Sequence, residues 1–342
     1  MTIRVALIGS GIHSREKLLP AIKNCSSIEL TAIYSRTLES ATKLAAGIPG
    51  LLLASDEGNA DDKNDLLSLI SSTEIDAVII ALPIDIQLKI VSAFLEAGKH
   101  VLSEKPIAAA MNEKGLDHLL HNHQDKWAIA ENYRFLSSFL FAAEQVKSLG
   151  KVLSFRTRVH KMVLEGEKFY ETPWRKTPRY QGGFLLDGGV HFIAGTRLLL
   201  GPENEPIKVS AFSSQLQRHL PPVDTVDAVW QLKSGISGTF ACSFGTTFEG
   251  DEYAVSCEKG TVTISKGCVT VKPLPDSGVK TVESKDMWNG PGIQEEIDAW
   301  AVGLLSGNPD HRLSPREALM DLKVLEAMLR SGENGGVVKE VV

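Results

Sequence analysis

The sequence predicts an α/β protein with two parts. The first is a doubly wound parallel sheet, and the second is an α/β domain built on an open, mainly antiparallel sheet. The chain opens on the apolar run Val5-Ala6-Leu7-Ile8, which ends in Gly9-Ser10-Gly11, a pattern typical of the first βα turn of a doubly wound sheet. Short apolar runs then alternate with helical stretches, as parallel sheets require. From about Lys151, strand patterns follow one another with few helices between them, which favours antiparallel pairing.

Length and composition fit an ordinary globular protein with two domains, which we place at residues 1–134 and 135–342. The net charge of −6 gives no basic surface for nucleic acid. No apolar run approaches the roughly 18 residues that span a bilayer. The first strand starts at Ile3, so we expect no leader peptide. The four cysteines lack metal-binding spacing and are interpreted as free thiols. We therefore expect a cytoplasmic protein without a membrane segment or a metal.

Six strands are predicted in the first domain, with helices between them. The first helix is expected to begin at Pro20, because proline suits the first helical turn, and residues 14–19 would then extend the preceding loop. The predicted strands are Arg4–Ile8, Leu30–Tyr34, Leu51–Ala54, Asp76–Ala81, His100–Leu102 and Trp127–Ala130, and the later helices are Thr37–Ala46, Asp61–Ile70, Ile84–Ala97 and Asn112–His123.

The second domain is predicted to contain an open sheet followed by two late helices. The predicted strands are Val152–Val159, Ile207–Ser213, Ala228–Leu232, Gly238–Phe244, Tyr253–Cys257 and Thr261–Ser265, and the helices are Ile293–Leu305 and Pro315–Ser331. Such a sheet would expose alternate residues of 226–232 and 240–244 unless something covers them, and an exposed apolar face of that size usually marks an interface.

The first βα turn is the candidate phosphate loop. Gly9 permits the tight turn, and Gly11 lets backbone amides approach a pyrophosphate at the start of the next helix. The loop continues through Ile12 and His13 to Ser14. Ser14 replaces the third glycine of the usual pattern; it is small enough for close packing, and its hydroxyl could donate to phosphate. A glycine turn without a nucleotide is the alternative for this motif taken alone.

The end of the second strand predicts the cofactor. Enzymes that prefer NAD place an acidic residue there to hold the ribose hydroxyls, whereas this chain has Ser35 and Arg36. A hydroxyl and a guanidinium suit the 2′-phosphate of NADP(H). The alternative is that Arg36 is an ordinary surface arginine.

Glu104-Lys105-Pro106 follows the fifth strand, at the sheet edge where ligands collect. Pro106 excludes helical geometry at Lys105 and fixes it at the strand tip. There the ammonium could stabilise a substrate oxyanion or pass a proton. A solvated lysine is the alternative. Leu82 and Pro83, after the fourth strand, are expected to line the nicotinamide ribose.

The segment from Gly182 to His191 supplies a carboxylate and an imidazole, Asp187 and His191, four residues apart. On one helical face they suit a general base oriented by an acid. An N-cap aspartate beside a packed histidine is the alternative. A metal pair is disfavoured, since no third ligand has suitable spacing.

These motifs together resemble the Gfo/Idh/MocA family of nicotinamide-dependent oxidoreductases, over essentially the whole chain. Trp174-Arg175 and Glu131-Asn132-Tyr133-Arg134 are similar to the branch with fungal NADP-dependent members and dihydrodiol-dehydrogenase-like enzymes. The resemblance implies a Rossmann fold and a Lys105 that contacts cofactor ribose and substrate oxygen. It also implies that Trp174 and Arg175 reach the cofactor, that the last helix packs on the first domain, and that the C-terminal sheet forms dimers or tetramers.

The resulting hypothesis is an NADP(H)-dependent oxidoreductase acting on a sugar, polyol, diol or small carbonyl compound. Lys105, Asp187 and His191 are its expected catalytic residues. The cofactor-binding set adds Gly9, Ser10, Gly11, Ile12, His13, Ser35, Arg36, Leu82, Pro83, Glu104, Lys105, Asn132, Trp174 and Arg175. The alternative is a non-catalytic NADP-sensing regulator of the same superfamily, which would not need a proton-handling cluster.

Two further features are interpreted as structural. The histidine-rich stretch 117–123 places only His118 and His121 on one helical face, which is typical of a solvated surface helix. Cys242 and Cys257 lie in predicted strands, where cysteine usually acts as a small buried hydrophobe.

Overall fold

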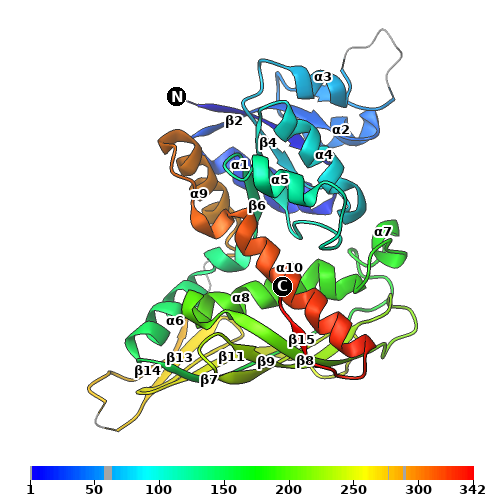
Figure 1. Ribbon diagram of the computed structural model, residues 1–342. Helices are drawn as coiled ribbons and strands as arrows, with labels where there is room; N and C mark the ends of the chain where they lie inside the picture. The colour runs from blue at the N-terminus through cyan, green and yellow to red at the C-terminus, as the bar shows by residue number, and fades with distance from the viewer. Residues whose placement is uncertain (1, 58–63, 276, 288–289) are drawn as a thin grey trace. The chain divides into compact units, whose positions relative to one another are not determined.

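The computed structural model describes residues 2–57, 64–275, 277–287 and 290–342, and Figure 1 shows the helices and strands. The chain divides into two compact units. Unit 1 comprises Met1–Glu131 with Ile293–Leu319, and unit 2 comprises Asn132–Gly292 with Met320–Val342. The first segment of unit 1 ends three residues before the boundary that we placed after residue 134. A return of the chain to this unit was expected for the last helix, whereas in the structure it begins earlier, at Ile293.

Unit 1 contains a sheet of six strands in the order β3-β2-β1-β4-β5-β6, and every neighbouring pair is parallel. The order reverses between β1 and β4, and ligands of doubly wound sheets bind at the carboxyl ends of the strands beside that reversal. All six predicted strands are confirmed. Their bounds are β1 (Ile3–Ile8), β2 (Ile28–Tyr34), β3 (Leu52–Ala54), β4 (Ala77–Ile80), β5 (His100–Glu104) and β6 (Trp127–Ala130).

The helices of unit 1 follow the strands as predicted. α2 (Leu38–Ala45) begins after Thr37, whose side chain accepts the N–H of Ser40. α3 (Leu66–Ser71) begins with a capping box formed by Asp65 and Ser68. In the helix predicted over Asp61–Ile70, residues 61–63 lie outside the described residues. The remaining predicted helices are α4 (Ile84–Glu96) and α5 (Leu116–Asn122).

The start of the first helix differs from the prediction. Ile12 and His13 are already helical, a π-helical turn spans Ser14–Leu18, and α1 (Leu19–Asn24) follows. The expectation that residues 14–19 form a loop was therefore wrong. Pro20 has no N–H to donate into the preceding turn, and its ring would clash with that turn's carbonyl in a regular α-helix. A wider π turn ahead of it lets the helix continue through the proline.

A late segment completes unit 1. α9 (Ile293–Ser306) and the short helix η5 (His311–Leu313) belong to it, as do the first residues of α10 (Pro315–Glu333). Gln294 Nε2 donates to the carbonyl of Ala21 at 3.3 Å, and Ile297 and Trp300 are buried. The last helix was expected to pack on the first domain; in the structure α10 contributes its first residues, through Leu319, to unit 1, and the rest of α10 belongs to unit 2.

Unit 2 contains a nine-stranded sheet in the order β14-β13-β12-β11-β7-β10-β9-β8-β15. Its neighbours are antiparallel except for β10 and β7, so the mainly antiparallel prediction is confirmed. The predicted strands are β7 (Val152–His160), β8 (Pro206–Ser214), β9 (Thr225–Leu232), β10 (Ser237–Ser243), β11 (Gly250–Cys257) and β12 (Gly260–Ser265). Those missed are β13 (Cys268–Pro273), β14 (Val282–Asp286) and β15 (Lys339–Glu340).

The two faces of this sheet differ in polarity. α6 (Ser137–Ser148) and α8 (Val190–Leu200) lie over one face, together with α10, whose Met328 accepts the indole N–H of Trp230. The apolar alternate residues that we expected to be exposed are buried on the helix side: Val226, Ala228, Trp230, Leu232, Phe240, Cys242 and Phe244. The opposite face carries polar side chains and the isolated apolar residues Phe212 and Val229. The strand period of two correctly placed these apolar residues on one face of the sheet, and helices cover that face.

A buried ionic group joins three elements of unit 2. The carboxylate of Asp321 on α10 accepts from Arg134 Nη2 at 2.5 Å and from Arg197 Nη1 at 2.7 Å. The side chains of all three are no more than 6% exposed. Asp321 thereby fixes the 3₁₀ turn Asn132–Phe135 and α8 to α10.

The cysteines are free thiols, as predicted, and Cys25, Cys242 and Cys257 are buried. Burial raises the pKa of the Cys257 thiol to about 11, with a further contribution from Glu258. At neutral pH this group is therefore almost entirely the unreactive thiol. Among the residues that the structure describes, none of the helices combines the length and hydropathy needed to cross a bilayer.

Candidate active site

The first βα turn lies directly against the end of β4. Gly9 has a φ of +110°, and its N–H donates to the carbonyl of Tyr34 at 2.9 Å. A Cβ added at Gly9 would lie 2.2 Å from the carbonyl oxygen of Ala81. Both the positive φ and this close approach exclude any larger residue. Glycine is therefore required at this position because a side chain would not fit.

The rest of the loop leaves room for a phosphate group. Among the described residues, nothing lies within 4 Å of a Cβ added at Gly11, and helical structure begins at Ile12 with its N–H groups unshared by a preceding turn. Ser14 is fully buried, and its hydroxyl has no partner among the described residues. Of the two roles considered for Ser14, its position fits close packing rather than contact with phosphate. The loop therefore has open space at Gly11 next to the start of a helix.

The end of β2 carries the residues expected to select the cofactor. Ser35 is buried, and its hydroxyl bonds that of Ser10 at 2.7 Å, while Arg36 is exposed. The sequence analysis missed a carboxylate at this edge. Asp56, just after β3, accepts the hydroxyl of Tyr34 at 2.8 Å, and burial together with this bond raises the pKa of Tyr34. Asp56 thus places negative charge near Arg36.

A contact between an imidazole and a carboxylate links the candidate phosphate loop to the segment that carries Lys105. His13 Nε2 lies 2.9 Å from Glu104 Oε1, and the Glu104 side chain is only 15% exposed. Lys105 follows β5 directly and is half-buried. Two of the predicted cofactor residues are therefore in contact, and they hold Lys105 at the carboxyl end of the sheet in unit 1.

Gln87 is a positioning residue that the sequence analysis did not recognise. Its side chain is buried and spans two strand ends: Nε2 donates to the carbonyl of Glu104 at 2.5 Å, and Oε1 accepts from Leu82 at 3.4 Å. One amide side chain thereby fixes the Leu82-Pro83 turn to the Lys105 segment. The neighbouring Ile84 is a core residue.

In unit 2, Asp187 lies in an irregular helical turn. Gly182 and Gly183 have φ values of +85° and +43°. The chain then forms a π-helical turn, Leu185–Gly189, which continues directly into α8. Such π turns are frequent at functional sites. Asp187 is buried within this turn, and His191 follows in the first turn of α8 with its side chain half-buried.

Arg175 is the partner that the structure gives to Asp187. Arg175 Nε donates to Asp187 Oδ2 at 2.6 Å, and Nη2 lies 3.5 Å from Oδ1. The guanidinium also stacks on Trp174, 3.9 Å from the ring centroid, and both belong to the short helix α7 (Pro173–Lys176). We expected Trp174 and Arg175 only to reach the cofactor. In the structure, Arg175 instead joins this loop to the helical turn that contains Asp187.

His191 has an aromatic partner that was not expected. The ring of Tyr133 stacks on its imidazole with a centroid separation of 5.1 Å and an interplanar angle of 18°. The neighbouring Asn132 donates from Nδ2 to the carbonyl of Pro291 at 2.7 Å. Tyr133 thereby restrains the orientation of the His191 ring.

The candidate catalytic residues come from both units. Lys105 belongs to unit 1, whereas Asp187, His191 and Arg175 belong to unit 2.

Comparison with known proteins assigns the chain to a family. Residues 3–127 match the oxidoreductase family with an NAD-binding Rossmann fold, and residues 142–263 match the GFO/IDH/MocA C-terminal domain. The chain is 37% identical to dehydrogenase FPY6 of Fusarium mangiferae over 99% of both chains. The protein belongs to the Gfo/Idh/MocA family of oxidoreductases.

Other members of the Gfo/Idh/MocA family extend this similarity. D-xylose 1-dehydrogenase (NADP(+)) 2 of Haloferax volcanii is 26% identical over 97% of both chains. A crystal structure of an oxidoreductase from Thermotoga maritima has a TM-score of 0.86 and 29% identity, and it covers 100% of this chain and 99% of that one. The first unit of this family member is accordingly an NAD(P)-binding Rossmann fold.

Proposed function

We propose that the protein is an NADP(H)-dependent oxidoreductase that transfers hydride between the nicotinamide and a CH–OH or carbonyl carbon. The observation that carries this proposal is the contact of His13 Nε2 with Glu104 Oε1 at 2.9 Å, since it joins the phosphate loop to the residue next to Lys105. A sugar, polyol, diol or small carbonyl compound is the expected substrate, and the name of the xylose dehydrogenase relative supports the sugar class. NADP(H) turnover against a panel of these compounds tests the proposal.

The proposed chemistry divides among three residues. The bound cofactor supplies or accepts the hydride. In the oxidation direction, the substrate O–H loses its proton while its carbon loses hydride, and the C=O bond forms. The ammonium of Lys105 would stabilise the negative charge on that oxygen. His191 would take the proton, and the Asp187 carboxylate, positioned by Arg175, would stabilise the charged imidazole. Reduction uses the same groups in reverse.

We expect NADPH to bind at least about tenfold more tightly than NADH, a difference of about 1.4 kcal/mol. The exposed Arg36 at the end of β2 carries this preference, because a guanidinium pairs well with a 2′-phosphate. Arg36→Asp should erase or reverse it in fluorescence titrations with both nucleotides. Lys43→Asp, an equal charge change on α2 of the same unit, should preserve it. Equal dissociation constants in the parent protein would rule out the assignment.

We also propose that the protein forms a homodimer or homotetramer through the outer face of the unit 2 sheet. Phe212 and Val229 are 66% and 50% exposed there, on the paired strands β8 and β9. Light scattering at micromolar concentration should give at least twice the monomer mass, and Phe212→Glu combined with Val229→Lys should reduce it. A parent protein that scatters as a monomer would refute this proposal.

A cytoplasmic location is proposed from the cysteine chemistry. All four cysteines are free thiols, a state that persists in reducing compartments.

A further inference from the structure

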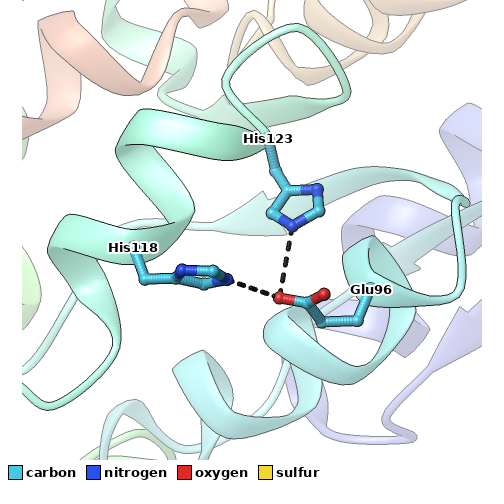
Figure 2. A group of neighbouring side chains, drawn as sticks. All are labelled: Glu96, His118 and His123. Atoms are coloured by element: carbon cyan, nitrogen blue, oxygen red, sulfur yellow. Dashed lines mark hydrogen bonds and ion pairs between the residues drawn. The ribbon is translucent and has the colours of Figure 1, made fainter.

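Two histidines and a glutamate converge on the surface of unit 1. Glu96 is the last residue of α4, His118 lies in α5, and His123 follows the end of α5. Figure 2 shows both imidazoles pointing at the same carboxylate oxygen. His118 Nε2 lies 2.8 Å and His123 Nε2 lies 3.2 Å from Glu96 Oε1. The three atoms all lie within 4.8 Å of one another.

The histidine-rich stretch forms a largely exposed helix, as interpreted from the sequence, but the convergence of His118 and His123 on Glu96 was not foreseen. Helical spacing pairs His118 with His121, but α5 ends at Asn122 and the chain turns there. The turn directs His123 back toward His118, with the ring centroids 5.9 Å apart. The third group comes from α4, which local spacing along α5 could not indicate.

We propose that Glu96, His118 and His123 bind a divalent transition-metal ion such as Zn²⁺. Imidazole nitrogen with one carboxylate oxygen is a typical set of three protein ligands for zinc, with the remaining position left to water. At bond lengths of about 2.0–2.2 Å, tetrahedral ligand atoms lie about 3.3–3.5 Å apart. The two nitrogen–oxygen distances, 2.8 and 3.2 Å, are close to that value. Small side-chain rotations would therefore separate the two imidazole nitrogens and the carboxylate oxygen enough to place an ion between them.

A neighbouring amide can support the ligand geometry. Asn122 Nδ2 lies 3.0 Å from His118 Nδ1 and also donates to the His118 carbonyl at 3.0 Å. When Nε2 binds a metal, Nδ1 carries the proton, and the Asn122 amide can rotate to offer its oxygen to that N–H. Such partners orient metal-binding histidines and strengthen binding.

The site is separate from the proposed redox chemistry. α4 begins after the Leu82-Pro83 turn, and its 13 residues span about 20 Å before Glu96 is reached. The ion would instead connect α4 to α5. It would therefore stabilise unit 1 without entering the hydride transfer.

Calorimetric titration of the tag-free full chain with Zn²⁺ tests the proposal. We expect one site with a dissociation constant in the micromolar range. Glu96→Gln, His118→Ala and His123→Gln should each weaken binding by at least tenfold. His121→Ala is the matched control, since this exposed histidine lies on the same helix outside the cluster. Zn²⁺ should raise the Tm of the parent and of His121→Ala, but not that of His118→Ala.

Circular dichroism and NADPH affinity, unchanged in all four variants, would show that each remains folded and that the nucleotide site is independent. The proposal is overturned if the parent does not bind Zn²⁺ at 100-fold above the expected dissociation constant. It is equally overturned if the three ligand variants retain the parent's affinity, or if His121→Ala loses as much as they do.

Discussion

Lys105→Met should lower turnover by about 10²–10³ while NADPH affinity stays within a few-fold. The ammonium is expected to act on charge that develops only as the substrate reacts, so its removal should affect turnover far more than cofactor binding. Steady-state kinetics with the best substrate of the panel and a separate NADPH titration give the two values. Lys89→Met, at an exposed lysine on α4, is the matched control and should behave as the parent.

The proton-handling residues extend this prediction. His191→Ala should lower turnover by about 10²–10⁴, and Asp187→Asn should lower it through loss of charge. Arg175→Met should also lower turnover, because it removes the guanidinium that holds the Asp187 carboxylate. His311→Ala, at a histidine with an 88% exposed side chain, should be silent. If the Lys105, Asp187 and His191 variants all match the parent on every substrate that turns over, the catalytic assignment is wrong.

Asp321→Asn should lower the free energy of unfolding by about 3–5 kcal/mol. The carboxylate is shared by Arg134 and Arg197, and all three side chains are nearly inaccessible to water. An amide cannot balance two buried positive charges, and the site is too enclosed for solvent to do so. Urea unfolding followed by circular dichroism measures the loss.

Asp76→Asn is the control for Asp321, because Asp76 pairs with Arg4 at the surface. Solvent screens that pair, so its loss should be much smaller. A comparable loss for both variants would contradict the assignment of Asp321 as a buried anchor.

Asp321→Asn should also reduce turnover. Arg134 is next to Tyr133, which stacks on His191, and Arg197 lies on the same helix as His191.

Local sequence patterns were sufficient for most of the fold. Val226, Ala228, Trp230 and Leu232 recur at every second position, and this period of two predicted the strand β9 and grouped its apolar side chains on one face. The pattern did not show that helices bury that face. The π turns at Ser14–Leu18 and Leu185–Gly189 were not predicted. Helical periodicity does not distinguish a widened turn from a regular one, because the extra residue shifts the pattern only locally.

In the candidate site, too, local backbone features could be predicted from the sequence, whereas contacts between residues distant in sequence could not. The tight turn at Gly9 was predictable because its positive φ is a local backbone feature, whereas the close approach of Ala81, just after β4, was not. The partners of the side chains were not readable. Gln87 on α4 donates to Glu104 at the end of β5, and Glu96 of α4 contacts His118 of α5. These pairs depend on which helices and strands pack against each other. The spacing of residues along a single helix or strand carries no information about that packing.

The return of α9 to unit 1 has a consequence for how the nucleotide-binding half can be made. Residues 132–292 are translated between its two segments, so a ribosome completes most of unit 2 before it supplies the last part of unit 1. A fragment that ends at Glu131 would lack Ile297 and Trp300, which are buried in the intact chain. It would leave the apolar surface that they cover exposed to water. The Rossmann unit is therefore not a portable module, and its isolation requires a linker that joins residue 131 to residue 293.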